Sequence, residues 1–279
     1  MVLTARRQPD SLPEVAAPSV LLLVSEPLRA LAEWGAGLVL RRTVRRLAPA
    51  GDGHPVLVLP GLGASDRSTA LLRRFLGDLG DLGYQALPWE LGRNKGVRSG
   101  LEERMRTRLR QVHAQTGRKI TLVGQSLGGV YARELAKLEP DSVRQVISLG
   151  SPFAGHPHAT HATRLYEALS GDRVDDIPQE RQARVCRKPP VPTTSVYSKA
   201  DGVVAWPCSI EDGRPDGESI HLRGGSHLGM AASPAALWLL ADRLAQPEGR
   251  WQPFDPQGWQ RLAYGVNDHV GGPAAGAAS

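Results

Sequence analysis

Between residues 54 and 244, short apolar runs alternate with longer stretches in which apolar positions recur at helical spacing. Short runs bounded by turn residues are typical of buried strands, and the helical spacing is typical of helices that cover a sheet. The expected strands span 56–59, 84–87, 120–123, 143–149, 194–197 and 219–222, and the expected helices span 68–79, 101–113, 127–138 and 234–244. Because alternating strands and helices form right-handed crossovers, the pattern predicts an α/β fold, with a mostly parallel central sheet of about six strands covered by helices on both faces.

Two further stretches define the expected domain organisation. The segment 153–192 is longer than an ordinary connection in a compact sheet and has helical spacing in part, so we expect a helical lid insertion. The segment 19–47 also has helical spacing and precedes the first strand. We therefore expect a flexible arm at 1–18, a single domain over 19–249 that includes the lid, and a tail at 250–279 with a mobile end.

The expected helix at 19–47 ends in four arginines, Arg41, Arg42, Arg45 and Arg46. Two interpretations stay open: a helix packed on the domain with solvated arginines, or a surface helix that makes weak contact with anionic lipid. The formal net charge is +6. The basic residues are scattered among acidic ones, without zinc-finger spacing or an aromatic-rich RNA-binding signature, so no nucleic-acid partner is expected.

The two cysteines, Cys186 and Cys208, are too few for a disulfide framework or a four-ligand zinc site. They either form one bridge or stay unpaired as small apolar side chains, and the second state is favoured. No uninterrupted apolar run reaches the ~18 residues that a membrane span needs, and no obvious signal-peptide cleavage site is present. The expectation is a cytoplasmic protein, peripheral to a membrane if the arginines contact lipid.

The strand expected at 120–123 runs directly into Gly124-Gln-Ser-Leu-Gly128 and then into a helix. A G-x-S-x-G sequence in this context forms a sharp, strained turn that lifts the serine hydroxyl above the strand ends. Gly124 and Gly128 remove side chains that would clash in the turn. The N–H of Leu127 at the helix start would face a developing oxyanion. Ser126 is therefore the candidate nucleophile.

A serine nucleophile needs a base and an acid that orients the base. On this type of fold the chain order is serine, then aspartate or glutamate, then histidine. Asp201 follows the strand expected at 194–197, and His227 follows the strand expected at 219–222. Both positions lie at the carboxyl edge of the sheet, where the sites of α/β proteins form. Asp201 and His227 are therefore the candidate acid and base.

The other acids and histidines fit this arrangement less well. His54 precedes the first strand, His221 lies within a strand, and Asp172, Asp175 and Asp176 precede the fifth strand. A group of three histidines lies in the expected lid without a matching acidic motif, and we expect no metal there. These are His156, His158 and His161.

The loop after the first strand contains small residues that let the backbone approach a substrate, and the N–H of Leu62 is the expected second oxyanion donor. A second glycine-containing loop follows the next strand and should also border the site. The lid mixes apolar and charged residues, as suits a cover with an apolar face toward the site. The expected substrate-binding residues are Gly61, Gly63, Asn94, Phe153, Leu165 and Leu169.

The motifs PGLG, GQSLGG, GSPF, SKADGVV and GSHLG, in this order over residues 54–230, resemble those of the lipase/esterase branch of the α/β-hydrolase superfamily. The resemblance implies the α/β-hydrolase fold and a cofactor-free acyl-enzyme mechanism, in which His227 activates Ser126 and later water. It also implies a lid over an apolar acyl pocket and a small-molecule ester as substrate. The chain departs from larger members because a helical segment, rather than antiparallel strands, precedes the first parallel strand.

Other functions of this scaffold stay open at this point. The same fold supports acyl transfer, amide cleavage and carbon–carbon bond hydrolysis, and the fold does not select among them. A non-catalytic ligand receptor is a further alternative. Serine, aspartate and histidine in the expected order favour an enzyme over a receptor.

Overall fold

A central sheet of seven strands forms the core of the computed structural model, which describes residues 15–77, 83–154, 158–211 and 215–266. The strands are β1 (Pro55–Leu59), β2 (Gln85–Pro88), β3 (Ile120–Gln125), β4 (Val143–Leu149), β5 (Thr193–Tyr197), β6 (Gly217–Leu222) and β7 (Tyr264–Val266). Their order is β2-β1-β3-β4-β5-β6-β7, and all pairs are parallel except β6 with β7. The strand order reverses at β1, so ligand sites are expected at the carboxyl ends of the central strands.

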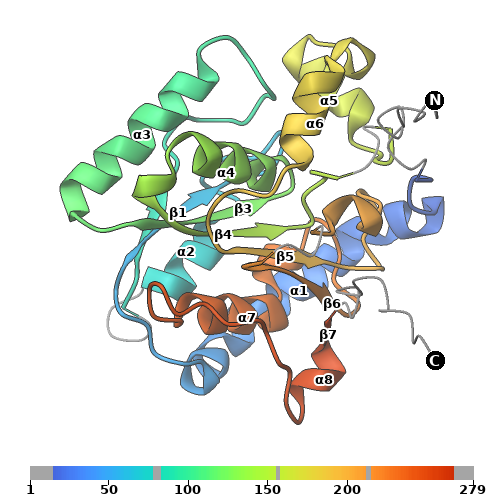
Figure 1. Ribbon diagram of the computed structural model, residues 1–279. Helices are drawn as coiled ribbons and strands as arrows, with labels where there is room; N and C mark the ends of the chain where they lie inside the picture. Colours follow the sequence, from blue (N-terminus) through green and yellow to red (C-terminus); the bar gives the residue numbers. More distant parts are fainter. Residues whose placement is uncertain (1–14, 78–82, 155–157, 212–214, 267–279) are drawn as a thin grey trace, which may run out of the picture.

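Helices cover both faces of the sheet (Figure 1). They are α1 (Val20–Leu47), α2 (Ala70–Gly77), α3 (Leu101–Thr116), α4 (Leu127–Leu138), α5 (Thr163–Ser170), α6 (Gln179–Cys186), α7 (Pro234–Leu244) and α8 (Gln260–Ala263). Strand β1 shows why two layers are needed, because its side chains alternate between two apolar cores. Val56 and Val58 belong to the core with α2 and α7, whereas Leu57 and Leu59 belong to the core with α3 and α4. The α/β fold predicted from the sequence is confirmed.

The structure corrects the expected count of about six strands. Each strand predicted from the sequence is present, and β7 is an additional strand within the segment 250–279, which we expected to be a tail. A three-residue strand is too short to show a periodicity, so the apolar pattern does not reveal it. Residues 1–14 and 267–279, which include most of the expected arm and the expected mobile end, lie outside the described residues.

The segment 153–192 forms α5, a 3₁₀ turn at Val174–Asp176 and α6 between β4 and β5. Figure 1 shows α5 and α6 beyond the carboxyl ends of the strands. Backbone hydrogen bonds attach its first half to the connection after β5: Ala154 N donates to Cys208 O at 2.8 Å, Ala205 N to Ala159 O at 3.0 Å, and His161 N to Val203 O at 2.9 Å. The two cysteines do not form a disulfide.

Helix α1 is packed on the domain, mainly against α7, with most of its leucines turned outward. Its inward side carries Glu26, Arg29 and Glu33, which bond to the loops after β5 and β6. A helix on a protein surface normally has the opposite arrangement, with apolar residues inward. The exposed large apolar residues of α1 are Val20, Leu21, Val24, Leu28, Leu31, Leu38, Val39, Leu40 and Leu47. In the part of the chain that the structure describes, no helix meets the length and apolarity of a membrane span.

Candidate active site

Ser126 lies on a sharp turn between β3 and α4, with φ 52° and ψ −125°. A non-glycine residue in this conformation is strained by about 1–3 kcal/mol, and such strain is typical of functional turns. The turn is held because Ser126 N donates to Leu149 O at 2.8 Å. A Cβ on Gly124 would overlap the Gly128 backbone, so the flanking glycine is required by close packing. The turn expected from the G-x-S-x-G sequence is present.

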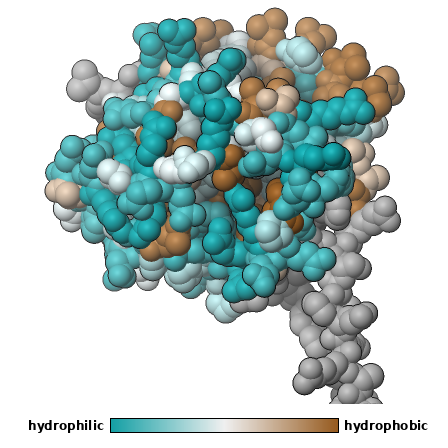
Figure 2. Space-filling model, turned by 90° about the horizontal axis from the view of Figure 1, so that it is seen from above, coloured by the Kyte–Doolittle hydropathy of each residue, from teal (hydrophilic) through white to brown (hydrophobic). Residues whose placement is uncertain are grey.

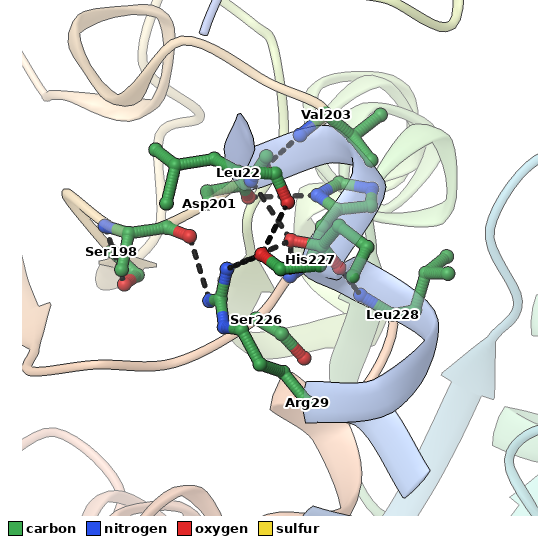
Figure 3. Close-up of polar contacts among 12 residues, drawn as sticks. Leu22, Arg29, Ser198, Asp201, Val203, Ser226, His227 and Leu228 are labelled. Atoms are coloured by element: carbon green, nitrogen blue, oxygen red, sulfur yellow. Dashed lines mark hydrogen bonds and ion pairs between the residues drawn. The ribbon is translucent and has the colours of Figure 1, made fainter. Parts of the chain in front are cut away.

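Asp201 and His227 form a buried pair at the same edge of the sheet. His227 Nδ1 lies 2.7 Å from Asp201 Oδ2, and both side chains are almost fully buried. The second oxygen, Asp201 Oδ1, accepts hydrogen bonds from Val203 N at 2.8 Å and Val204 N at 2.7 Å. Figure 3 shows Asp201 and His227 pointing toward each other. The carboxylate is therefore fixed in the position that orients the imidazole.

Charge and burial act on the His227 imidazole in opposite directions. Burial alone would lower its pKa, because it disfavours the charged form. The negative charge of Asp201, its hydrogen bond to Nδ1 and the charge of Glu26 raise the pKa, and the net effect is a pKa above the ordinary value. Asp201 and Glu26 therefore stabilise the protonated form of the His227 imidazole.

Gln125, the residue before Ser126, connects the turn to the loop that carries His227. Its side-chain Nε2 donates to His227 O at 2.9 Å. Among the described residues, no hydrogen bond joins Ser126 to His227 itself. Such bonds are often long or absent without substrate and tighten in the complex. The structure thus brings the three candidate residues to one edge and joins two of them directly.

The loop after β1 is held in place by Asn94. Gly63 N donates to Asn94 O at 2.7 Å, and Asn94 Nδ2 donates to Pro60 O at 2.9 Å. Gly63 N–H is thereby occupied. Within the described ranges, the N–H groups of Leu62 and Leu127 donate no hydrogen bond to the protein, and both residues border the same cavity as Ser126. These two backbone N–H groups are therefore free of protein partners among the described residues, and both belong to residues that border the cavity.

A cavity of about 220 Å³ opens beside Ser126 and is lined mostly by apolar side chains. Phe153 lines it as expected, and the buried guanidinium of Arg133, paired with Glu211, stacks on its ring at 3.6 Å. The segment 153–192 contributes lining residues beyond the expected substrate-binding residues. These include Tyr166, Val174, Ile177 and Val185.

Several expected substrate-binding residues do not line this cavity. Leu165 is half-exposed on the outer side of α5, and Leu169 packs near Gly63 instead. Asn94 is buried and supports the loop after β1. Gly61 and Gly63 belong to this loop, but only Leu62 between them borders the cavity. Leu165 does not line the cavity because α5 is oriented with its neighbour Tyr166 facing inward.

Sequence reasoning missed two acids of α1 that bond to the loop of His227. Glu26 is fully buried and accepts from the N–H groups of His227 and Leu228. Glu33 accepts from Ser226 N and Ser226 Oγ, both at 2.8 Å. Their spacing of seven residues on one helix face was a visible signal, but nothing in the sequence shows which loop that face meets.

Comparisons with known proteins agree with the fold. No protein-family model matches the chain. The chain is 28% identical over 116 residues to triacylglycerol lipases of Pseudarthrobacter phenanthrenivorans and Burkholderia plantarii, and each match covers 39% of this chain. It spans only 36% and 32% of these relatives, about a third of their length.

Among solved structures, lipase B of Aspergillus fumigatus is similar with a TM-score of 0.53 and 20% sequence identity. The match covers 73% of this chain and 56% of that one. The sheet order, the strained serine turn and these similarities agree with the resemblance drawn from the motifs. Together they show the α/β-hydrolase fold.

Proposed function

We propose that the protein is a serine hydrolase that cleaves carboxylic esters, with Ser126 as nucleophile, His227 as base and Asp201 as the acid that orients the base. The observation that carries this proposal is the buried Asp201–His227 pair, 2.7 Å between oxygen and nitrogen, at the sheet edge that presents Ser126 on a strained turn. An apolar cavity borders that serine. The arrangement suits acyl transfer to a serine hydroxyl.

The proposed reaction follows from the direction of the hydrogen bonds. Asp201 Oδ2 accepts the Nδ1 proton of His227, which leaves Nε2 to accept the proton of Ser126 Oγ. The serine oxygen then attacks the ester carbonyl, and the N–H groups of Leu62 and Leu127 stabilise the oxyanion. His227 next protonates the leaving alcohol. Water, activated by the same imidazole, hydrolyses the acyl-enzyme.

The apolar lining of the cavity favours a small-molecule ester with an apolar acyl group as substrate. Burying each CH₂ of an acyl chain contributes about 0.8 kcal/mol, so an apolar cavity favours longer chains until it is filled. The segment 153–192 contributes much of this lining, and we propose that it acts as a lid that excludes water during the reaction.

Labelling with a fluorophosphonate tests the nucleophile directly. Wild-type protein should react at Ser126, identified by mass spectrometry, and should hydrolyse nitrophenyl esters. Ser126→Ala should neither react nor turn over, since loss of one member of such a triad costs about 10⁴-fold or more in kcat. A circular dichroism spectrum like that of wild type would show that the fold is retained. Unlabelled wild-type protein would favour a ligand receptor over an enzyme.

We further propose that the outward side of α1 makes weak contact with an anionic membrane surface. That side exposes apolar residues over most of the helix, and Figure 2 shows apolar side chains gathered along one margin of the molecule. Towards its carboxyl end, α1 carries the arginines for which the sequence left lipid contact open, of which Arg42 and Arg46 are exposed. Apolar burial combined with basic residues is what holds a helix in the plane of a membrane interface.

A further inference from the structure

We propose that Glu26 of helix α1 is a positioning residue for His227, which it holds in place through the backbone of the loop after β6. This proposal rests on the function proposed above, in which His227 is the base. It goes beyond that function because it makes the N-terminal helix part of the catalytic apparatus.

One carboxylate fastens both loops that carry the acid and the base. Glu26 Oε1 accepts from Gly202 N at 2.8 Å and from His227 N at 2.9 Å, and Oε2 accepts from Leu228 N at 3.0 Å. Gly202 directly follows Asp201 in the chain. Glu26 therefore fixes the backbone beside the acid and the backbone of the base relative to each other.

The loops are shaped for close contact with α1. A Cβ on Gly202 would lie 2.5 Å from the Leu22 carbonyl, and a Cβ on Gly229 would lie 2.8 Å from Ala30 Cα. Both glycines thus permit a backbone approach that another residue would block. Arg29 Nη2 adds a hydrogen bond to Ala200 O at 2.7 Å. Helix α1 therefore contacts both loops through close approaches at these two glycines as well as through Glu26.

A buried carboxylate suits this position better than an amide. Glu26 faces three N–H donors and has two oxygens to accept them, whereas glutamine would replace one oxygen by a donor. A donor against a buried donor leaves both unsatisfied. The replacement should therefore shift the loop that carries His227, and a displacement of about 1 Å in an active site can lower the rate by about 100-fold.

The charge of Glu26 also acts on the imidazole. The charged groups that face this region are Asp201 from the loop after β5 and Glu26, Arg29 and Glu33 from α1. Burial lowers the pKa of His227, while Asp201 and Glu26 raise it. Arg29 Nη1 lies 3.8 Å from Glu26 Oε1. Removal of the Glu26 charge should therefore lower the pKa of His227.

The test compares three variants of the full chain: Glu26→Gln, Glu26→Asp and Glu33→Gln. Glu26→Gln should lower kcat by about 10- to 100-fold with little change in KM, and shift the acid limb of the pH profile to lower pH. Glu26→Asp keeps the charge but has a shorter reach, so it should lower kcat and keep the wild-type midpoint. Glu33→Gln makes the same chemical change seven residues further along the helix, and should leave the midpoint unchanged.

A second measurement is independent of turnover. The His227 imidazole is titrated by NMR in a Ser126→Ala background, with and without Glu26→Gln, and its pKa should fall on removal of the Glu26 charge. An unchanged pKa together with wild-type kcat for Glu26→Gln would overturn the proposal. So would a Glu33→Gln variant that reproduces the entire effect, since α1 would then act only as packing. Absence of esterase activity in wild type would contradict the proposed function instead, and the titration would still report on Glu26.

Discussion

Asp201 uses each of its oxygens for a different purpose, one for His227 and one for the backbone of its own loop. In Asp201→Asn, the amide can keep the backbone bonds through its oxygen but presents a donor to Nδ1. His227 should then adopt the wrong tautomer, and kcat should fall by about 10⁴-fold with little change in stability. Steady-state hydrolysis of a nitrophenyl ester measures kcat, and thermal unfolding measures the stability of the fold. A loss of less than tenfold would place the acid elsewhere.

The raised pKa of His227 predicts the pH dependence of the reaction. A histidine base acts in its neutral form, so activity should rise with pH as the imidazolium loses its proton. Since the charge of Asp201 raises the pKa against the effect of burial, the midpoint of kcat/KM should lie above the ordinary histidine value of 6.5. A profile from pH 5 to 9 measures it. A midpoint below 6.5 or a flat profile would contradict a histidine base paired with Asp201.

At the scale of the elements, the segment 153–192 has two side chains of equal size that can serve as a test position and its control. Ile177 lines the cavity, whereas Leu165 is 50% exposed and does not. Each CH₂ in an apolar pocket is worth about 0.8 kcal/mol, roughly fourfold in kcat/KM. Ile177→Ser should therefore reduce the advantage of longer acyl esters over acetate esters, and Leu165→Ser should leave it unchanged. Equal losses of kcat/KM for esters of all acyl chain lengths would indicate that the segment is a structural insertion.

The elements that could be predicted from the sequence are those in which the spacing of apolar residues corresponds to the side that is buried. Strand β3, the serine turn and α4 follow from a buried apolar run and two glycines, and the chain order then makes Asp201 and His227 the candidate acid and base. The orientation of α1 could not be predicted, because its apolar and charged residues are both distributed around the helix and most of its leucines are exposed whereas Glu26 is buried. Only the partner decides which side is buried, and here the partner is a set of backbone N–H donors.

At the scale of the whole molecule, the exposed side of α1 leads us to expect binding to a lipid surface. The protein should co-sediment with vesicles that contain phosphatidylglycerol, less with phosphatidylcholine alone, and should be released at high salt. Leu28→Asp with Leu31→Asp should reduce binding to both, because both side chains are exposed on α1. Arg42→Glu with Arg46→Glu should reduce only the preference for anionic lipid.

Leu262→Asp is the control for these variants, since Leu262 is 81% exposed and belongs to another helix, α8. It should leave vesicle binding unchanged. If wild type shows no salt-sensitive binding, the arginines are solvated and the outward side of α1 has another role.

Strand β7 has a consequence for how copies of this protein meet one another. A sheet that ended at β6 would present a row of unpaired N–H and C=O groups, which can template the addition of a strand from another molecule. The three residues of β7 pair antiparallel with the last three residues of β6, so the outermost strand at this margin is very short. At the opposite margin, β2 is only four residues long and ends in Pro88, which has no N–H to offer. Both margins thus resist edge-to-edge aggregation. A concentrated solution of this protein should therefore remain free of intermolecular sheets, even though the exposed side of α1 is apolar.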